Sequence, residues 1–193
     1  MITPDGRRLI ATRGLRGYAD GLIAASLAGY LGDTLGYSGT RIGVIATGML
    51  FGSAVLTMFT GAWGWRFERR TLLRAGALLM IITGLVFATS TTFIVLLAFG
   101  VIGTMNPSGS DVNVVQPIEQ SLLPLTTTDA HRSRIFARYT FFGGSLAALG
   151  ALSAALPARF RWHGSSVFVI YACAGVAMLA VYATMSPQVE SAA

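Results

Sequence analysis

The side chains best suited to bind a polar solute or a coupling ion gather in one stretch of the chain, residues 103–120. This stretch follows a strongly apolar run, 93–101, and contains five residues of interest: Asn106, Pro107, Asp111, Gln116 and Glu119. At bilayer depth, ionisable groups and interrupted backbone are costly unless protein or a wet cavity encloses them. We therefore predict that these five residues line a polar path, which the other segments enclose.

Two interpretations of this stretch remain open. The 32 residues from 92 to 123 would span roughly 48 Å as one helix, which exceeds the ~30 Å hydrocarbon core. In the first interpretation, a discontinuous membrane helix presents its broken ends to a solute. In the second, the helix ends near Asn106, and Asp111 caps a short cytoplasmic helix. If the segment is helical, Asp111 and Glu119 lie near one face.

Asp20 lies within the first apolar segment, four residues after Arg16, so the two side chains share one helical face. One interpretation is an ion pair at the membrane interface that reaches cytoplasmic water. The other is a gating or coupling carboxylate near the inner mouth of a path.

Catalytic chemistry finds little support in the sequence. The two histidines, His131 and His163, lie in or beside expected loops, and no expected span holds a histidine that could activate Ser145. The single cysteine, Cys173, cannot form a disulfide or a cysteine-rich metal site. We therefore expect no enzyme activity, no cofactor and no metal.

Composition indicates an all-α, polytopic membrane protein. Of 193 residues, 53% are hydrophobic and 11% are charged, whereas soluble domains carry about 25% charged residues. Six membrane spans of about 20 residues are expected, at 10–31 (or from 14), 42–62, 72–89, from 92 into the polar stretch, 136–156 and 167–185. Residues 1–186 would form one bundle, and 187–193 a cytoplasmic tail or the start of a linker.

Arginine placement predicts the orientation. All 14 basic residues are arginine, which gives a net charge of +6. With the N-terminus inside, Arg41, Arg159 and Arg161 lie outside, and eleven lie in the cytoplasm: Arg7, Arg8, Arg13, Arg16, Arg66, Arg69, Arg70, Arg74, Arg132, Arg134 and Arg138. This bias follows the positive-inside rule, so we expect a plasma (inner) membrane protein with both termini cytoplasmic, and no nucleic-acid partner.

Glycines at small-xxx-small spacing, Gly17 with Gly21 and Gly48 with Gly52, allow helix backbones to approach closely. They predict tight packing within one bundle or, as the alternative, a dimer face.

The loop after the second expected span resembles the helix 2–3 loop of the major facilitator superfamily of secondary transporters. Four residues match that pattern and would form a cytoplasmic gate loop: Gly61, Arg66, Arg69 and Arg70. Trp65 and Glu68 depart from it, because the family has an acidic residue and a glycine there. Residues 35–43 and 118–124 also resemble family passages, so the resemblance covers nearly the whole chain.

The resemblance implies the N-terminal, six-helix half (3+3) of a twelve-helix fold. It further implies secondary active transport of a small solute by alternating access, with export as one direction and with a need for a second six-helix half, from another copy or a separate chain. Protons are one candidate coupling ion. The arginine that many proton-driven exporters carry in helix four is missing from 93–101, so Asp20, Asp111 and Glu119 are the candidate replacements.

A chain with only six expected helices leaves three explanations. It is a truncated gene product, a half-transporter that pairs with itself or a sister chain, or a non-transporting membrane subunit or interaction protein.

Overall fold

The computed structural model describes residues 2–107, 115–156 and 163–186. Within these ranges the secondary structure is helical and contains no strand, which confirms the all-α prediction. The helices are α1 (Pro4–Gly29), α2 (Gly39–Trp63), α3 (Arg69–Thr89), α4 (Phe93–Ile102), α5 (Val115–Leu122), α6 (Arg132–Ser153) and α8 (Ser166–Ala183). A π-helical turn (Tyr30–Thr34) extends α1, and 3-10 turns occupy Gly64–Arg66, Leu123–Thr126 and Asp129–His131.

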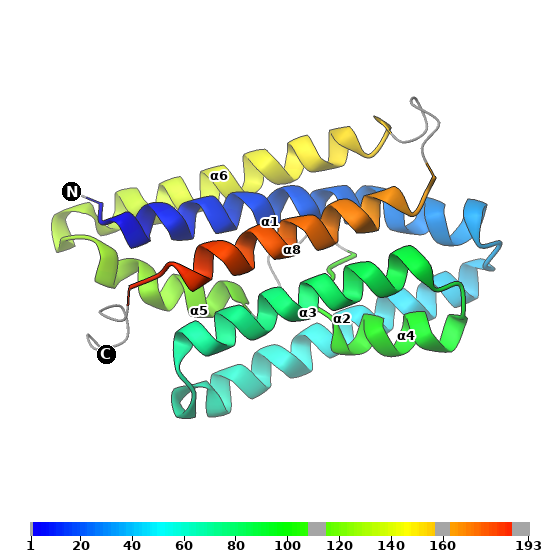
Figure 1. The fold of residues 1–193 in the computed structure, drawn as a ribbon, viewed down its shortest axis with the longest axis horizontal. Coiled ribbons are helices and arrows are strands. Elements are labelled where there is room, and N and C mark those ends of the chain that lie inside the picture. Colours follow the sequence, from blue (N-terminus) through cyan, green and yellow to red (C-terminus); the bar gives the residue numbers. More distant parts are fainter. Residues whose placement is uncertain (1, 108–114, 157–162, 187–193) are drawn as a thin grey trace.

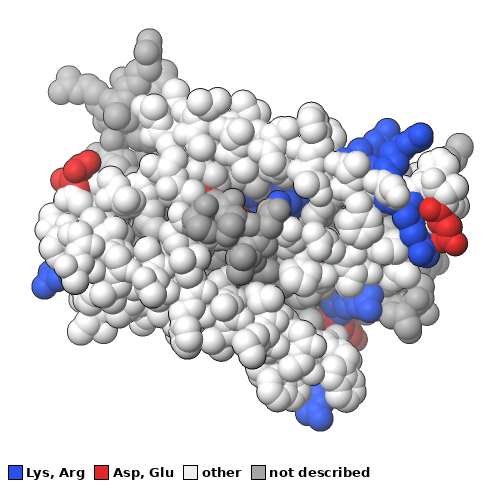
Figure 2. All heavy atoms as spheres, turned by 180° about the vertical axis from the view of Figure 1, so that it is seen from behind, with Lys and Arg blue, Asp and Glu red and all other residues white. Residues whose placement is uncertain are grey.

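The long helices form an antiparallel bundle (Figure 1). Helix α1 packs mainly against α6 and also against α8, while α3 packs against α8 and α2 against α4. The start of α1, the α2–α3 connection, the start of α6 and the end of α8 lie at one end of the bundle. The arginines of these segments therefore share that end, and Arg41 lies at the other. Figure 2 shows arginine side chains gathered toward that end, with uncharged residues over most of the rest of the face in view.

Four helical segments of the described residues are long and apolar enough to cross a membrane: Gly39–Arg66, Arg69–Thr89, Asp129–Ser153 and Ser166–Ala183. They correspond to the second, third, fifth and sixth expected spans. Helix α4 has only 10 residues, about 15 Å at 1.5 Å per residue, and crosses about half the hydrocarbon core. Helix α1 has 26 residues, but its charged side chains keep it out of the apolar set. The structure thus supports a multi-pass membrane protein with at least these four spans.

Helix α1 begins at Pro4, six residues before the earliest start expected from the sequence, Ile10. Proline is well suited to the first helical position, and the Thr3 side-chain oxygen accepts a hydrogen bond from the backbone N–H of Gly6 at 3.3 Å. The expected start assumed that a span begins where the charges end. In the fold, Asp5 is buried and pairs with Arg8 while Arg7 stays exposed, and the helix includes all three residues.

Glycines bring α1 and α6 into backbone contact. A Cβ added at Gly17 would overlap the carbonyl oxygen of Gly143, and one added at Gly21 would overlap that of Ala147. In the same way, a Cβ at Gly52 of α2 would overlap the carbonyl of Val101 in α4. The glycine spacing therefore serves packing within one bundle, the first of the two predicted roles.

Candidate functional site

The polar stretch interrupts the fourth expected span inside the bundle. Helix α4 ends at Ile102, where Gly103 donates its backbone N–H to Phe99 at 2.8 Å, and residues 103–107 are not helical. Asn106 is buried, as is its neighbour Met105. Pro107 follows at an intermediate exposure. The described chain resumes as α5 at Val115, and Asp111 lies outside the described residues.

Glu119 of α5 is fully buried and holds the centre of a hydroxyl cluster. Its Oε1 accepts hydrogen bonds from Thr12 Oγ1 at 2.6 Å and from the Tyr182 hydroxyl at 2.5 Å. Its Oε2 accepts one from the Tyr139 hydroxyl at 2.6 Å. Because these donors come from α1, α8 and α6, one carboxylate joins four helices. An ionised carboxylate only accepts hydrogen bonds, so three hydroxyl donors suit the charged form.

Two buried arginines of α1 balance the charge of this cluster. Arg16 is 4% exposed, donates a hydrogen bond to the Tyr182 hydroxyl oxygen at 3.5 Å, and interacts electrostatically with Glu119 and Asp20. Arg13 is also buried, and its guanidinium lies over the Tyr139 ring at 5.6 Å from the centroid. Buried charges persist in a protein interior when they are paired and hydrogen-bonded. Arg16 meets that condition through the Tyr182 hydroxyl, Glu119 and Asp20.

Asp20 lies one turn beyond Arg16 on α1 and is also buried. The predicted shared face of Arg16 and Asp20 therefore points into the bundle, where both side chains are buried. Asp20 also interacts electrostatically with Tyr171 of α8, whose hydroxyl lies 3.4 Å from Thr104 Oγ1 in the interrupted stretch. Arg16 and Asp20 thus connect the two sides of the interruption: Glu119 on the α5 side and Thr104 on the α4 side.

Gln116 is buried on α5, three residues before Glu119. Of the path residues predicted from the sequence, the structure therefore buries four in the bundle: Asp20, Asn106, Gln116 and Glu119.

Sequence reasoning missed the partners of Glu119. Thr12, Tyr139 and Tyr182 are polar residues on otherwise apolar or arginine-rich helices, and they lie 107, 20 and 63 residues from Glu119 in the chain. Their polar groups within expected spans were a usable signal, because such groups seek partners inside the bundle. Nothing in the sequence indicated that all three converge on one carboxylate.

The predicted gate loop lies beside α5. Gly61 is in the last turn of α2, Arg66 ends the following 3-10 turn, and Arg69 and Arg70 begin α3. The Arg66 guanidinium lies over the Trp65 ring at 5.1 Å. A cavity of about 400 Å³ is lined by loop residues, including Gly61 and Arg69, and by three residues of α5, Pro117, Ile118 and Ser121. The loop therefore contacts the same short helix that carries Glu119.

Comparison with known proteins identifies the family. The family model of the Major Facilitator Superfamily matches residues 9–192. A curated yeast relative, the "Uncharacterized membrane protein YJR124C" of Saccharomyces cerevisiae, is 33% identical over 100 residues. That match covers 52% of this chain and 21% of the yeast protein, so the chain spans about a fifth of the length of that relative. Since the family match covers nearly every residue of the bundle, the chain belongs to the major facilitator superfamily.

Proposed function

We propose that this chain is the N-terminal, six-helix half of a secondary transporter that moves a small solute by alternating access. Membership of a family of transporters, and not of enzymes, supports the proposal. The arginine-rich end of the bundle would face the cytoplasm, which places both termini on the cytoplasmic side of the plasma membrane. Export is the direction we favour.

The buried Glu119 cluster is the observation that carries this proposal. A fully buried carboxylate that joins four helices is more than packing requires, and intramembrane ionisable groups commonly mark ion or solute pathways. We take Glu119 as the coupling residue and the proton as the coupling ion. Protonation would neutralise the acceptor, weaken the charge-assisted hydrogen bonds and leave Asp20 as the remaining carboxylate that interacts with Arg16.

Because the chain is interrupted between α4 and α5, protonation of Glu119 could move α5. Helix α5 has eight residues and is not continuous with α4 through residues 103–107, so it can shift without moving the whole span. A shift of α5 would reach the gate loop through the cavity that they share. Gly61, Arg66, Arg69 and Arg70 would then open or close the cytoplasmic side, while Asp20, Asn106, Pro107, Asp111 and Gln116 line the solute path.

A second six-helix half is part of the proposal. Most residues of the α2 and α6 spans are unburied in this chain, and large apolar side chains such as Phe51, Met58 and Phe141 are exposed. One half leaves any central path open to lipid on one side. A second copy or a sister chain would cover these faces and enclose the path.

Replacing Glu119 by glutamine in the complete two-half assembly tests the coupling role. Proteoliposomes would be screened with a panel of labelled organic cations, anions, sugars and amino acids, with and without a pH gradient. For any solute that the wild type moves, E119Q should abolish uphill, gradient-driven transport and retain downhill exchange, because glutamine keeps the shape but cannot titrate. The chain alone, as a monomer, should move none of the panel. Gradient-driven transport that survives E119Q would refute the coupling role.

Asp111 is tested in the same assay. Asp111→Asn should reduce transport if Asp111 lines the path. Unaltered transport with unaltered pH dependence would instead assign Asp111 to capping a short helix, the second interpretation of the sequence.

A further inference from the structure

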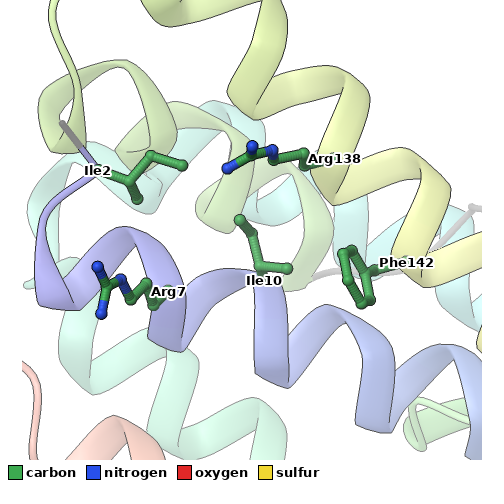
Figure 3. A pocket seen from close by; sticks show the side chains of 5 residues that line it. All are labelled: Ile2, Arg7, Ile10, Arg138 and Phe142. Carbon is green, nitrogen blue, oxygen red and sulfur yellow. The ribbon is translucent and has the colours of Figure 1, made fainter.

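A groove away from the Glu119 cluster opens at the arginine-rich end, between the first turns of α1 and α6. It has a volume of about 700 Å³ and is lined by Ile2, Arg7, Ile10, Arg138 and Phe142 (Figure 3). Arg138 reaches from α6 across the groove toward Ile2, and Arg7 projects from α1 below it. Ile10 and Phe142 line the other end. The groove thus combines two cations with an apolar surface.

The two arginines are available for a ligand. Both are exposed, and in the described part of the chain neither guanidinium has an ion pair or hydrogen bond. Two arginines close to them in the chain, in contrast, are already paired with carboxylates. Arg8 pairs with Asp5 at 2.6 Å, and Arg132 pairs with Asp129 at 2.8 Å. Among the described residues, no carboxylate therefore neutralises the positive charge of the groove.

Further basic groups adjoin the groove. A second cavity, of about 140 Å³, shares Ile2 and Arg138 with it and adds His131, Arg134 and Ile135. A ligand that extended from the groove into this second cavity would therefore meet a third arginine, Arg134. Guanidinium groups bind phosphate oxygens with two parallel hydrogen bonds, so a phosphate is the anion that this arrangement suits best.

An apolar stripe leads away from the arginines along α6. Phe142 follows Arg138 by four residues and Leu149 follows it by eleven, which places them on one helical face, and both are about half exposed, at 47% and 53%. From Arg138 to Leu149 the helix rises about 16 Å, close to the ~15 Å of hydrocarbon in one leaflet. The charged groove and the stripe together have the dimensions of one phospholipid molecule.

We propose that this groove binds an anionic phospholipid of the leaflet at the arginine-rich end of the bundle, with the phosphate on Arg7 and Arg138 and an acyl chain along Phe142 and Leu149. Basic pockets between membrane helices bind anionic headgroups in this way. A second copy of this chain fits less well, because its own surplus is positive, with 14 arginines against 8 carboxylates. The inference shares only the membrane setting with the proposed transport function.

Lipid retention measured by native mass spectrometry tests the proposal on the full chain. The probes are phosphatidylglycerol and phosphatidylcholine with identical acyl chains. The wild type should retain phosphatidylglycerol preferentially, and salt should weaken that retention. The double variant R7Q/R138Q should bind it roughly twenty-five times more weakly, because each basic group near anionic lipid contributes about a factor of five.

The matched control is R8Q/R132Q, which removes two charges from the same ends of the same helices. Those arginines already pair with Asp5 and Asp129, so phosphatidylglycerol retention should stay within about twofold of wild type. If the R7Q/R138Q protein is unstable, R7K/R138K and the salt dependence of the wild type provide the same comparison, and lysine should retain part of the affinity.

Four outcomes would overturn the proposal. They are equal loss in both double variants, equal retention of the two lipids, displacement of the lipid by millimolar inorganic phosphate, and a dimer whose formation depends on Arg7 and Arg138. None of these readouts involves transport, so the lipid site and the coupling role of Glu119 can fail separately.

Discussion

At the scale of single residues, the described structure concentrates its buried charge on one point. Glu119 is surrounded by the hydroxyls of Thr12, Tyr139 and Tyr182, and Arg16 provides a nearby positive charge. Polar interactions in a low-dielectric interior are mutually strengthening when complete and destabilising when one partner is missing. The stability of the bundle and the proposed coupling therefore depend on the same atoms.

This dependence predicts a measurable energy for one hydroxyl. Tyr182→Phe removes a donor to the carboxylate and should lower the free energy of unfolding by about 1.5–3 kcal/mol, the range for hydrogen bonds to charged groups. In the E119Q background the same change should have a markedly smaller effect, because the pair is coupled. Tyr37→Phe is the control, since its hydroxyl bonds to the Thr91 carbonyl near the opposite end of the bundle. Additive effects of Y182F and E119Q in steric-trapping measurements would rule out the coupling.

At the scale of elements, close contact between α1 and α6 holds the cluster together. Thr12, Arg13 and Arg16 lie on α1, and Tyr139 lies on α6, so the distance between these two backbones sets the hydrogen-bond geometry. Glycines set that distance: a Cβ at Gly150 of α6 would overlap the carbonyl oxygen of Tyr18 in α1, whereas a Cβ at Gly144 meets open space.

The two glycines of α6 form a matched pair for mutation. Gly144→Ala should stabilise the fold by up to about 1 kcal/mol, because alanine favours a helix over glycine. Gly150→Ala gains the same propensity but forces α6 away from α1, and should be destabilising by about 1–3 kcal/mol. Unfolding of both variants in the same detergent gives the comparison. Equal stabilisation by the two would show that the backbone contact is looser than described.

The elements also show how far sequence reasoning reached. The length of the apolar runs predicted the first and last residues of α2, α3, α6 and α8 to within about four residues, because helices that face lipid must be long and apolar. It placed the start of α1 at Ile10 or Gly14, whereas the helix begins at Pro4, ahead of the apolar residues, where Thr3 caps it. The break near Asn106 was predicted from its polar residues. The convergence of α1, α6 and α8 on Glu119 was not, because it depends on contacts between distant segments.

At the scale of the whole molecule, family membership and the antiparallel order of the helices agree with the predicted all-α, multi-pass membrane bundle. The order of three family-like passages, at 35–43, 61–70 and 118–124, indicated the family, which the match over residues 9–192 confirms. Arginines lie at the start of α1, in the α2–α3 connection and at the start of α6, and these three segments meet at one end of the bundle. The proposed lipid groove lies at this end, and the proposed coupling site lies deeper in the bundle, so one chain would present two separate binding regions.

The charges that α1 buries against α6 and α8 have a consequence for biogenesis. When α1 emerges from the ribosome, the helices that supply Tyr139 and Tyr182 do not yet exist, and each of Arg13, Arg16 and Asp20 opposes insertion by about 3 kcal/mol near the membrane centre. A segment ending at residue 38, with a glycosylation reporter behind it, should therefore integrate poorly into microsomes. R13L/R16L should restore its integration, and the full chain should integrate α1 without any change. Efficient integration of the short segment would contradict this order. Within this chain, α1 is made before its partners, so it would be among the last of these helices to integrate stably into the bilayer.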